Sequence, residues 1–285
     1  MRFVLKTAGM LLILAAFTGC LVRPMEELVY EDSGETLELR YFFQDPEGVY
    51  LATLREDFGI MERTSSASSD LQRLQILTEW VHGLWEHHAD HTASSLDPLT
   101  ILWEAETAPG FRGIESAVVL SGALQSIAVP TRYVTLHGRT IEESADAHVV
   151  VEAYLRDRQE WVMADPLWNR IPLYQEEPVS AYRLQQAMMH EPRSITYLQR
   201  RRDVSYSRWI REYLYYMHTN QDSRLNTDVY AFKNLMLVPK NLPIPRYFSP
   251  YHRHMGYDLS ESASVTHDPS YFYGTPIMLF DDETE

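Results

Sequence analysis

A histidine and an aspartate near the middle of the chain have the spacing of a catalytic pair. His148 begins the apolar segment 148–155, and Asp165 follows the next apolar segment, 161–164. The polar turn between these segments predicts an antiparallel pair of strands, in which the two side chains can meet. A carboxylate beside an imidazole fixes its tautomer and stabilises the imidazolium, as nucleophilic catalysis requires. The same spacing also fits a histidine at a strand end and an aspartate that starts a turn.

Three helices are predicted on the N-terminal side of this pair. Apolar residues at helical spacing indicate an amphipathic helix over about 70–88, and a shorter helical pattern covers 96–105. Residues 114–128 are apolar or small, and Glu115 is their one ionisable side chain. We therefore expect this third helix to be buried nearly all round, at the centre of the domain.

Strands follow the central helix. Pro130 ends that helix, and β-rich composition predicts a meander of three strands at 131–136, 148–155 and 161–164. A buried helix followed by an antiparallel meander indicates an α+β fold. Elsewhere the sequence predicts an irregular apolar segment at 41–55, helical structure over about 180–217 and an irregular region over 235–285.

Four sequence blocks resemble the bacterial transglutaminase-like superfamily. The resemblance covers about residues 70–170 and implies a papain-like core, in which a cysteine begins the central helix and a histidine and an aspartate follow on two strands. His148 and Asp165 match the last two positions, whereas Gly113 stands at the position of the cysteine. The blocks are Phe111 to Leu120, Ile127 to Val134, Ala147 to Glu152 and Trp161 to Pro166.

Glycine at position 113 predicts a pseudoenzyme, because it has no side chain that could attack a substrate. Ser116 lies one helical turn further, ~4.5 Å along the axis, beyond the roughly 3 Å reach that a base needs, and Ser121 is further still. Loss of a triad nucleophile costs on the order of 10⁶ in kcat. The alternative is an active amide-bond hydrolase or acyltransferase that uses another nucleophile, such as Ser116.

An emptied site could still bind a ligand. The unpaired backbone N–H groups at Gly113, Ile114 and Glu115 begin the central helix and suit a carboxylate or a carbonyl oxygen. We therefore expect either a binding module for a peptide, a cell-wall fragment or a partner protein, or a scaffold. The formal net charge of −15 disfavours nucleic acid as a partner.

Two other clusters are assigned to structure rather than to chemistry. His87 and His91 have the i, i+4 spacing that can hold zinc, but no third ligand is near them in the sequence, so we expect them to lie at a helix C-terminus and predict neither metal nor cofactor. The aromatic residues between Trp209 and Tyr216 are at helical spacing and are predicted to be core rather than a sugar platform.

The N-terminus has the features of a lipoprotein signal. Residues 1–19 comprise a short basic end and an apolar run, and they end in Phe-Thr-Gly before Cys20, the single cysteine of the chain. This ending resembles the bacterial lipobox, which implies that Cys20 carries lipid and anchors the protein in the cell envelope. By the same resemblance Leu21 favours the outer membrane, where the cell has one. We expect a tether at 20–40 and a single domain at 41–285.

We predict that Cys20→Ala releases the protein from the membrane, because acyl chains anchor by ~0.8 kcal/mol per buried methylene and the variant would have none. Detergent phase partitioning of wild type and variant measures this. Equal recovery of both proteins in the aqueous phase would remove the anchor.

Overall fold

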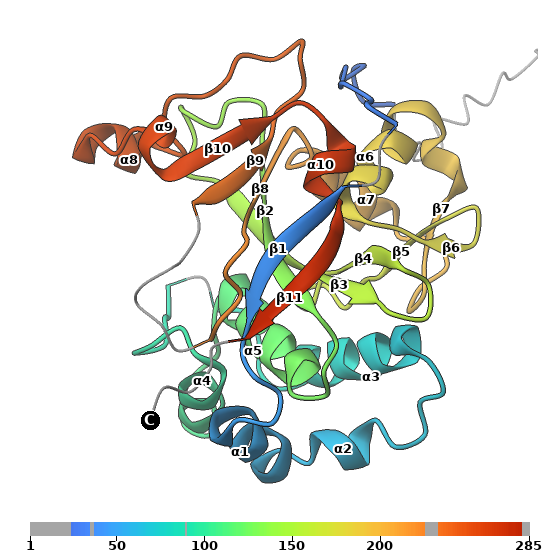
Figure 1. The fold of residues 1–285 in the computed structure, drawn as a ribbon, viewed down its shortest axis with the longest axis vertical. Helices are drawn as coiled ribbons and strands as arrows, with labels where there is room; N and C mark the ends of the chain where they lie inside the picture. Colours follow the sequence, from blue (N-terminus) through green and yellow to red (C-terminus); the bar gives the residue numbers. More distant parts are fainter. Residues whose placement is uncertain (1–23, 35–36, 89, 226–232, 281–285) are drawn as a thin grey trace, which may run out of the picture.

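A six-stranded sheet lies at the centre of the protein, with helices on both of its faces (Figure 1). The computed structural model describes residues 24–34, 37–88, 90–225 and 233–280. The strand order is β10-β9-β8-β2-β3-β4, and every neighbouring pair is antiparallel except β10 and β9. The α+β class expected from the sequence is confirmed.

Eleven strands are present in the described part of the chain, in three sheets. The central sheet comprises β2 (Thr131–His137), β3 (Ala147–Leu155), β4 (Glu160–Ala164), β8 (Tyr216–Asn220), β9 (Asn234–Leu237) and β10 (Ala263–Thr266). A small sheet comprises β5 (Pro172–Tyr174), β6 (Glu177–Pro178) and β7 (Ile195–Tyr197), and a parallel pair comprises β1 (Glu38–Phe43) and β11 (Thr275–Phe280).

The helices before the meander gather on one face of the sheet. They are α1 (Val49–Asp57), α2 (Ile60–Arg63), α3 (Asp70–His82), α4 (Pro98–Glu104) and α5 (Gly113–Gln125). The later helices are α6 (Ala181–His190), the 3-10 turn η1 (Pro192–Ser194), α7 (Val204–Arg211), α8 (Pro250–Met255), α9 (Leu259–Ser262) and α10 (Pro269–Phe272). In the described residues, no helix combines the length and the apolar character needed to cross a membrane.

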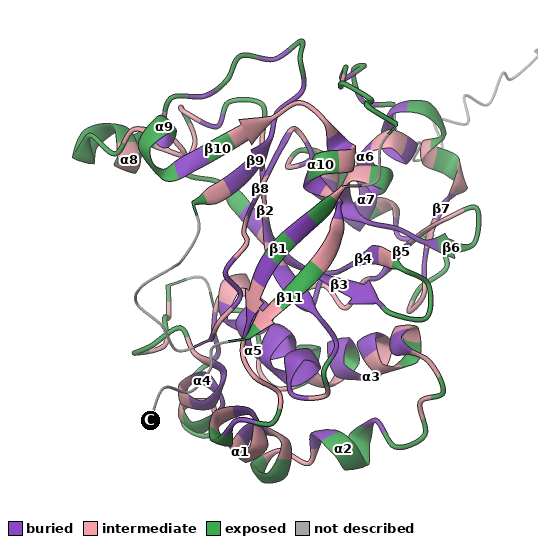
Figure 2. Cartoon of the chain, in the orientation of Figure 1, coloured by how far each residue is buried: buried purple, intermediate pink, exposed green. Residues whose placement is uncertain are grey.

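The sheet separates two hydrophobic cores. Alternate residues of β3 point to opposite faces, so that Val151 and Ala153 pack with α5 while Val150 and Tyr154 pack with the C-terminal elements. Helix α5 is buried along almost its whole length, as its apolar sequence predicts (Figure 2). The predicted meander is also confirmed, since β2, β3 and β4 pair in sequence order.

Several element predictions were wrong. The helix predicted at 70–88 ends at His82, because Gly83 caps it. The helical region predicted over 180–217 is interrupted by β7 and ends in β8, and the region over 235–285 contains two strands of its own and part of β9. Residues 41–55 are not irregular but contain the end of β1 and most of α1. Short strands such as β7 form because tertiary pairing overrides weak local preference.

Residues 24–34, expected to belong to a free tether, instead lie on the body of the domain. Met25 and Leu28 are buried in the core of the C-terminal face. The backbone N–H of Met25 donates to the carbonyl of Met188 at 3.1 Å, and that of Lys240 donates to the carbonyl of Val29. The acidic composition of this segment concealed its few apolar anchors. Cys20 and the signal segment lie outside the described residues.

A fully buried ion pair joins the elements of the C-terminal face. Arg132 of β2 and Glu152 of β3 are paired in register, and Arg132 Nη2 lies 2.7 Å from Glu152 Oε2. Arg132 also donates to the Tyr41 hydroxyl and to the Phe272 carbonyl, while Glu152 Oε1 accepts from the N–H of Ala181 at the start of α6. Strands β1, β2 and β3 and helices α6 and α10 therefore converge on one pair of charges.

We expect Arg132→Met to lower the free energy of unfolding by about 3–5 kcal/mol, because it leaves the Glu152 carboxylate buried without its partner. Urea unfolding followed by circular dichroism measures the change. Lys240→Met is the control, since the Lys240–Glu31 pair is half exposed and such a pair contributes only about 0–1 kcal/mol. Equal effects of the two substitutions would contradict a central role for the buried pair.

Candidate functional site

The structure brings His148 and Asp165 together, as the sequence predicts. Nε2 of His148 lies 2.7 Å from Oδ2 of Asp165, and the side chains are 5% and 0% exposed. His148 is the second residue of β3, and Asp165 directly follows β4, so the antiparallel pairing of these strands creates the contact. An ionised carboxylate only accepts hydrogen bonds, so Nε2 carries the proton and Nδ1 is the acceptor. Nδ1 is the atom that could accept a proton from a substrate or nucleophile.

Asp165 is held by three donors. Besides His148, the Tyr206 hydroxyl donates to Oδ2 at 2.9 Å and the Trp168 N–H donates to Oδ1 at 3.2 Å. Burial raises the pKa of Tyr206 well above its ordinary value, and the neighbouring Asp165 carboxylate raises it further. Tyr206 therefore remains a hydrogen-bond donor throughout the physiological range. These contacts fix the carboxylate, which in turn fixes the imidazole.

Helix α7 and the residues that directly follow it supply the aromatic wall of the site. Trp209 meets the His148 ring edge to face, with centroids 4.6 Å apart, and Tyr213 lies 6.0 Å from the same ring. Two aromatic residues that the sequence assigned to the core, Trp209 and Tyr213, therefore pack against the dyad of His148 and Asp165. Asp203 caps α7 by accepting from the N–H of Tyr206, and Arg170 forms an ion pair with Asp203. Burial alone would raise the pKa of Asp203, but these hydrogen bonds outweigh it and lower the pKa.

Gly113 is the first residue of α5, where the resemblance implies a cysteine. The space beside it is tight, because a β-carbon built on Gly113 would lie 3.1 Å from Cδ2 of Leu167. Leu167 belongs to the loop that follows Asp165, and Nδ1 of His82 lies 3.1 Å from the carbonyl oxygen of Leu167 and 3.2 Å from that of Pro166. His82 thus holds the loop that packs on Gly113.

The other predicted site residues have different surroundings. Glu115 is fully buried and forms an ion pair with Arg112 at 2.7 Å, so its carboxylate is already engaged, whereas Ile114 lines a cleft described below. Ser121 lies 2.6 Å from the Thr131 hydroxyl and accepts from Gln125, in a buried polar cluster of α5 and β2. Ser116 is buried on α5.

A cleft of about 630 Å³ lies between α5 and the sheet. Ile114, which follows Gly113, and Val149, which follows His148, both line it. Its walls combine apolar side chains with amides, hydroxyls and an ion pair between Asp222 and Arg224 at 2.6 Å. His218 also lines the cleft, and burial lowers its pKa to about 4, so it is neutral at physiological pH. The remaining lining residues are Ser95, Leu96, Asp97, Val118, Tyr133, Thr135, Thr219, Asn220, Leu225 and Asn234.

His87 and His91 do not lie on a helix, because α3 ends before them. His87 forms an isolated bridge with Phe111, and the His91 ring packs against the same phenylalanine with centroids 5.1 Å apart. Within the described ranges, no three histidine, cysteine or acidic side chains are grouped closely enough to hold a metal ion. The sequence placed these histidines at the C-terminus of the first predicted helix; this was wrong, because α3 ends at His82 and both histidines lie beyond it, against Phe111.

Sequence reasoning missed Tyr206, Trp209 and Leu167 as parts of the site. Tyr206 and Trp209 lie about 40 residues beyond Asp165 in the chain, so no local pattern connects them with it. Leu167 lies two residues after Asp165. This closeness to Asp165 in the sequence could have marked Leu167 as a residue of the site, but only the fold shows that its side chain lies against Gly113.

One family model and two solved structures are similar to parts of this chain. The Transglutaminase-like superfamily matches residues 59–166. A candidate cysteine protease from Cytophaga hutchinsonii is similar in structure, with a TM-score of 0.34 and 16% identity over 42% of this chain and 39% of the other. A candidate protease from Parabacteroides distasonis gives a TM-score of 0.29 and 16% identity over 41% of this chain and 26% of the other.

Both structural matches are partial, since this chain covers well under half of either neighbour. No curated protein sequence matches the chain significantly. The family match spans the helices and strands that hold Gly113, His148 and Asp165. Residues 59–166 of this chain are therefore a transglutaminase-like domain.

Proposed function

We propose that the protein is a lipid-anchored, non-catalytic binding module of the cell envelope, which holds a peptide or a cell-wall peptide fragment in the cleft beside α5. The observation that carries this proposal is the state of position 113. Gly113 has no nucleophilic side chain, and a β-carbon there would lie 3.1 Å from Cδ2 of Leu167, so that Leu167 would have to shift by a few tenths of an ångström to admit one. A base and its orienting carboxylate remain, but they have no nucleophile to activate.

Ser116 and Ser121 are poor replacements for a thiol. The Ser121 hydroxyl already forms hydrogen bonds with Thr131 and Gln125, and Ser121 lies eight residues after Gly113. Ser116 lies a full turn beyond Gly113, which displaces it by ~4.5 Å along α5. A hydroxyl also has a far higher pKa than a thiol, so it needs a closely placed base.

The cleft has the chemistry of a peptide site. Its volume of about 630 Å³ lies within the roughly 300–1,000 Å³ that small-molecule sites occupy. Ile114, Val118 and Val149 provide an apolar wall. The side-chain amides of Asn220 and Asn234 can donate to a peptide group, and the Asn220 oxygen already accepts from the N–H of Asp222. Since α5 begins at this wall, its N-terminal dipole favours a carbonyl or carboxylate group of the ligand.

The envelope location rests on the N-terminal sequence. Cys20 follows a segment typical of a secretory signal, and its ending resembles a lipobox. Residues 24–34 then lie on the domain itself, so only a short stretch of chain separates the proposed lipid from the folded body. On this proposal the domain is held close to the membrane surface.

Filling the cleft should abolish ligand binding. We expect the full chain in detergent to bind the cell-wall stem peptide L-Ala-γ-D-Glu-L-Lys-D-Ala-D-Ala in calorimetry, and Val149→Trp to weaken this binding at least about tenfold because the indole occupies the site. Val49→Trp is the matched control, since Val49 is 76% exposed on α1 and outside the cleft. Absence of binding by wild type, or equal binding by both variants, would refute the peptide assignment.

Restoring the thiol tests whether the dyad is still arranged for catalysis. In a Cys20→Ala background, we expect Gly113→Cys to have a thiol pKa below the ordinary ~8.5, because a helix N-terminus and a nearby imidazolium stabilise a thiolate. Leu167→Ala is combined with it, since Leu167 lies 3.1 Å from the new β-carbon. The pH dependence of iodoacetamide alkylation gives the pKa.

His148→Ala should return that pKa toward the ordinary value, and Val49→Cys provides an exposed reference thiol. An ordinary pKa in Gly113→Cys that does not respond to His148→Ala would show that the base does not face position 113. Covalent labelling of wild-type Ser116 by an electrophilic acyl probe would instead favour the active hydrolase.

A further inference from the structure

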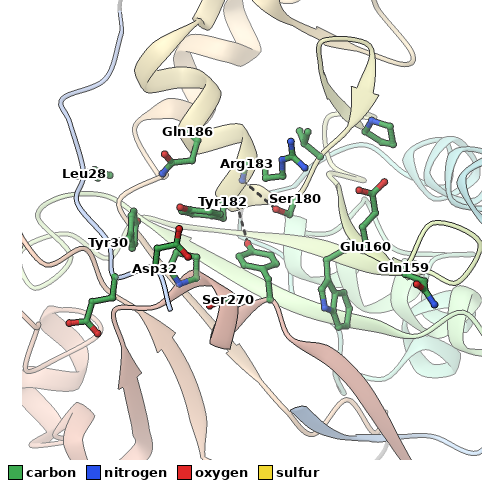
Figure 3. Close-up of a pocket in the computed structure, with 16 residues that line it drawn as sticks. Leu28, Tyr30, Asp32, Gln159, Glu160, Ser180, Tyr182, Arg183, Gln186 and Ser270 are labelled. Atoms are coloured by element: carbon green, nitrogen blue, oxygen red, sulfur yellow. Dashed lines mark hydrogen bonds between the residues drawn. The ribbon is translucent and has the colours of Figure 1, made fainter. Parts of the chain in front are cut away.

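A second cavity, of about 530 Å³, lies at the β4 side of the molecule (Figure 3). Four segments that are distant in sequence form it: residues 28–32, residues 159–161, residues 178–186 at the start of α6, and residues 269–273 around α10. Neither member of the dyad lines it, and it shares no lining residue with the cleft beside α5. It is therefore a separate site.

Aromatic rings line this cavity from four elements. They belong to Tyr30, Trp161, Tyr182 and Tyr273. Tyr182 meets Tyr30 edge to face with centroids 5.2 Å apart, and its centroid lies 5.9 Å from that of Tyr273. Rings in mutual contact have few alternative rotamers, so the wall is largely preorganised.

The polar atoms of three of these rings are already used by the protein. The Tyr30 hydroxyl donates to Gln185, the Tyr273 hydroxyl donates to Glu152, and the Trp161 indole N–H donates to the Gly274 carbonyl. Trp161 is only 4% exposed and lies under the Arg132 guanidinium, so it mainly supports the wall. The three tyrosines are half-buried, and what they can offer a ligand is ring surface rather than hydrogen bonds. Since Glu152 belongs to the buried ion pair, the core of the domain itself fixes the Tyr273 ring.

The rim of the cavity supplies donors and acceptors. Figure 3 shows Tyr30 and Asp32 at one end and Gln159 at the other, with Gln186 and Arg183 on the α6 side. The side-chain amides can donate and accept at once, and the guanidinium can donate several hydrogen bonds. A ligand in the cavity would therefore meet aromatic faces in the middle and hydrogen-bonding groups around its edge.

The charges of the lining nearly cancel. Glu31 lies 2.9 Å from Lys240, and Glu160 is paired with Arg158, so both carboxylates are neutralised by cations outside the cavity. Of the remaining lining charges, the carboxylate of Asp32 is matched in number by the guanidinium of Arg183. A site without excess charge has no electrostatic preference for an ionic ligand.

From these features we infer that this cavity binds a neutral saccharide of one to three pyranose rings. A pyranose has C–H groups on its faces, which complement the negative faces of aromatic rings, and hydroxyls around its edge, which complement amides and carboxylates. A ligand that was wholly apolar would leave the rim unpaired, and a ligand that was wholly polar would leave the rings without contact.

Calorimetric titration of the full chain with triacetylchitotriose and, separately, with cellotriose tests the inference. We expect a dissociation constant of about 0.1–10 mM for at least one of these trisaccharides, and Tyr182→Ala should weaken it about tenfold or more by removing a ring from the wall. Gln186→Ala should weaken it as well. Among the described residues, the Gln186 side chain makes one hydrogen bond, a long one of 3.4 Å to Gln185, so this variant should fold normally.

Tyr251→Ala is the matched control, since Tyr251 is 63% exposed and lies outside the cavity. Binding that is lost in both Tyr182→Ala and Gln186→Ala but kept in Tyr251→Ala supports the site. Val149→Trp should leave trisaccharide binding intact, because Val149 lines the cleft beside α5 and not this cavity. Failure of the peptide proposal can therefore be told apart from failure of the saccharide inference. No binding of either sugar at 20 mM (roughly the weakest measurable range), or equal binding in all variants, would overturn the inference.

Discussion

The buried pair of Arg132 and Glu152 is the interaction on which the arrangement of the C-terminal half depends. Two opposite charges without access to water are stable only when their remaining hydrogen-bonding groups are also satisfied. Here the partners come from β1, α6 and α10, and the guanidinium also lies over the rings of Trp161, Phe272 and Tyr273. Removal of any of these elements would leave a buried hydrogen-bonding group of the pair without a partner. The pair therefore specifies which elements must meet.

This constraint also links the fold to the second cavity. Glu152 accepts from Tyr273, whose hydroxyl in turn accepts from the N–H of Tyr182 at 3.1 Å. The aromatic wall is thus a direct extension of the ion pair toward the surface. Trp161 takes part from the other side, since it lies under the guanidinium at 4.4 Å and lines the cavity. The buried ion pair therefore also holds the Tyr273 and Tyr182 rings of the cavity wall in place.

The residues around His148 and Asp165 hold strands and a helix together as well as orienting the imidazole. The supports of a working base remain: Asp165 orients His148, Tyr206 and Trp168 hold Asp165, and Asp203 anchors the helix that carries Tyr206. These residues also tie β3, β4 and α7 together, so the fold itself retains them whether or not catalysis occurs. Gly113 adds no side chain to this network, and a β-carbon at this position would lie 3.1 Å from Cδ2 of Leu167. The hydrogen-bond network around His148 and Asp165 is therefore complete without a side chain at position 113.

The sequence by itself determined the central helix and the meander, because both depend on local composition. It also showed that His148 and Asp165 could meet, since a short turn between two apolar segments favours antiparallel strands, but it left a purely structural role open for both residues. Tertiary structure alone decided that residues 24–34 pack on the body, that β1 pairs with β11, and that Tyr206 and Trp209 meet the dyad. These contacts join residues far apart in the chain, and a single sequence carries no periodic signal for them. The charge of Arg132 is visible in the sequence, but its burial is not, because only the folded chain brings together the groups that satisfy it.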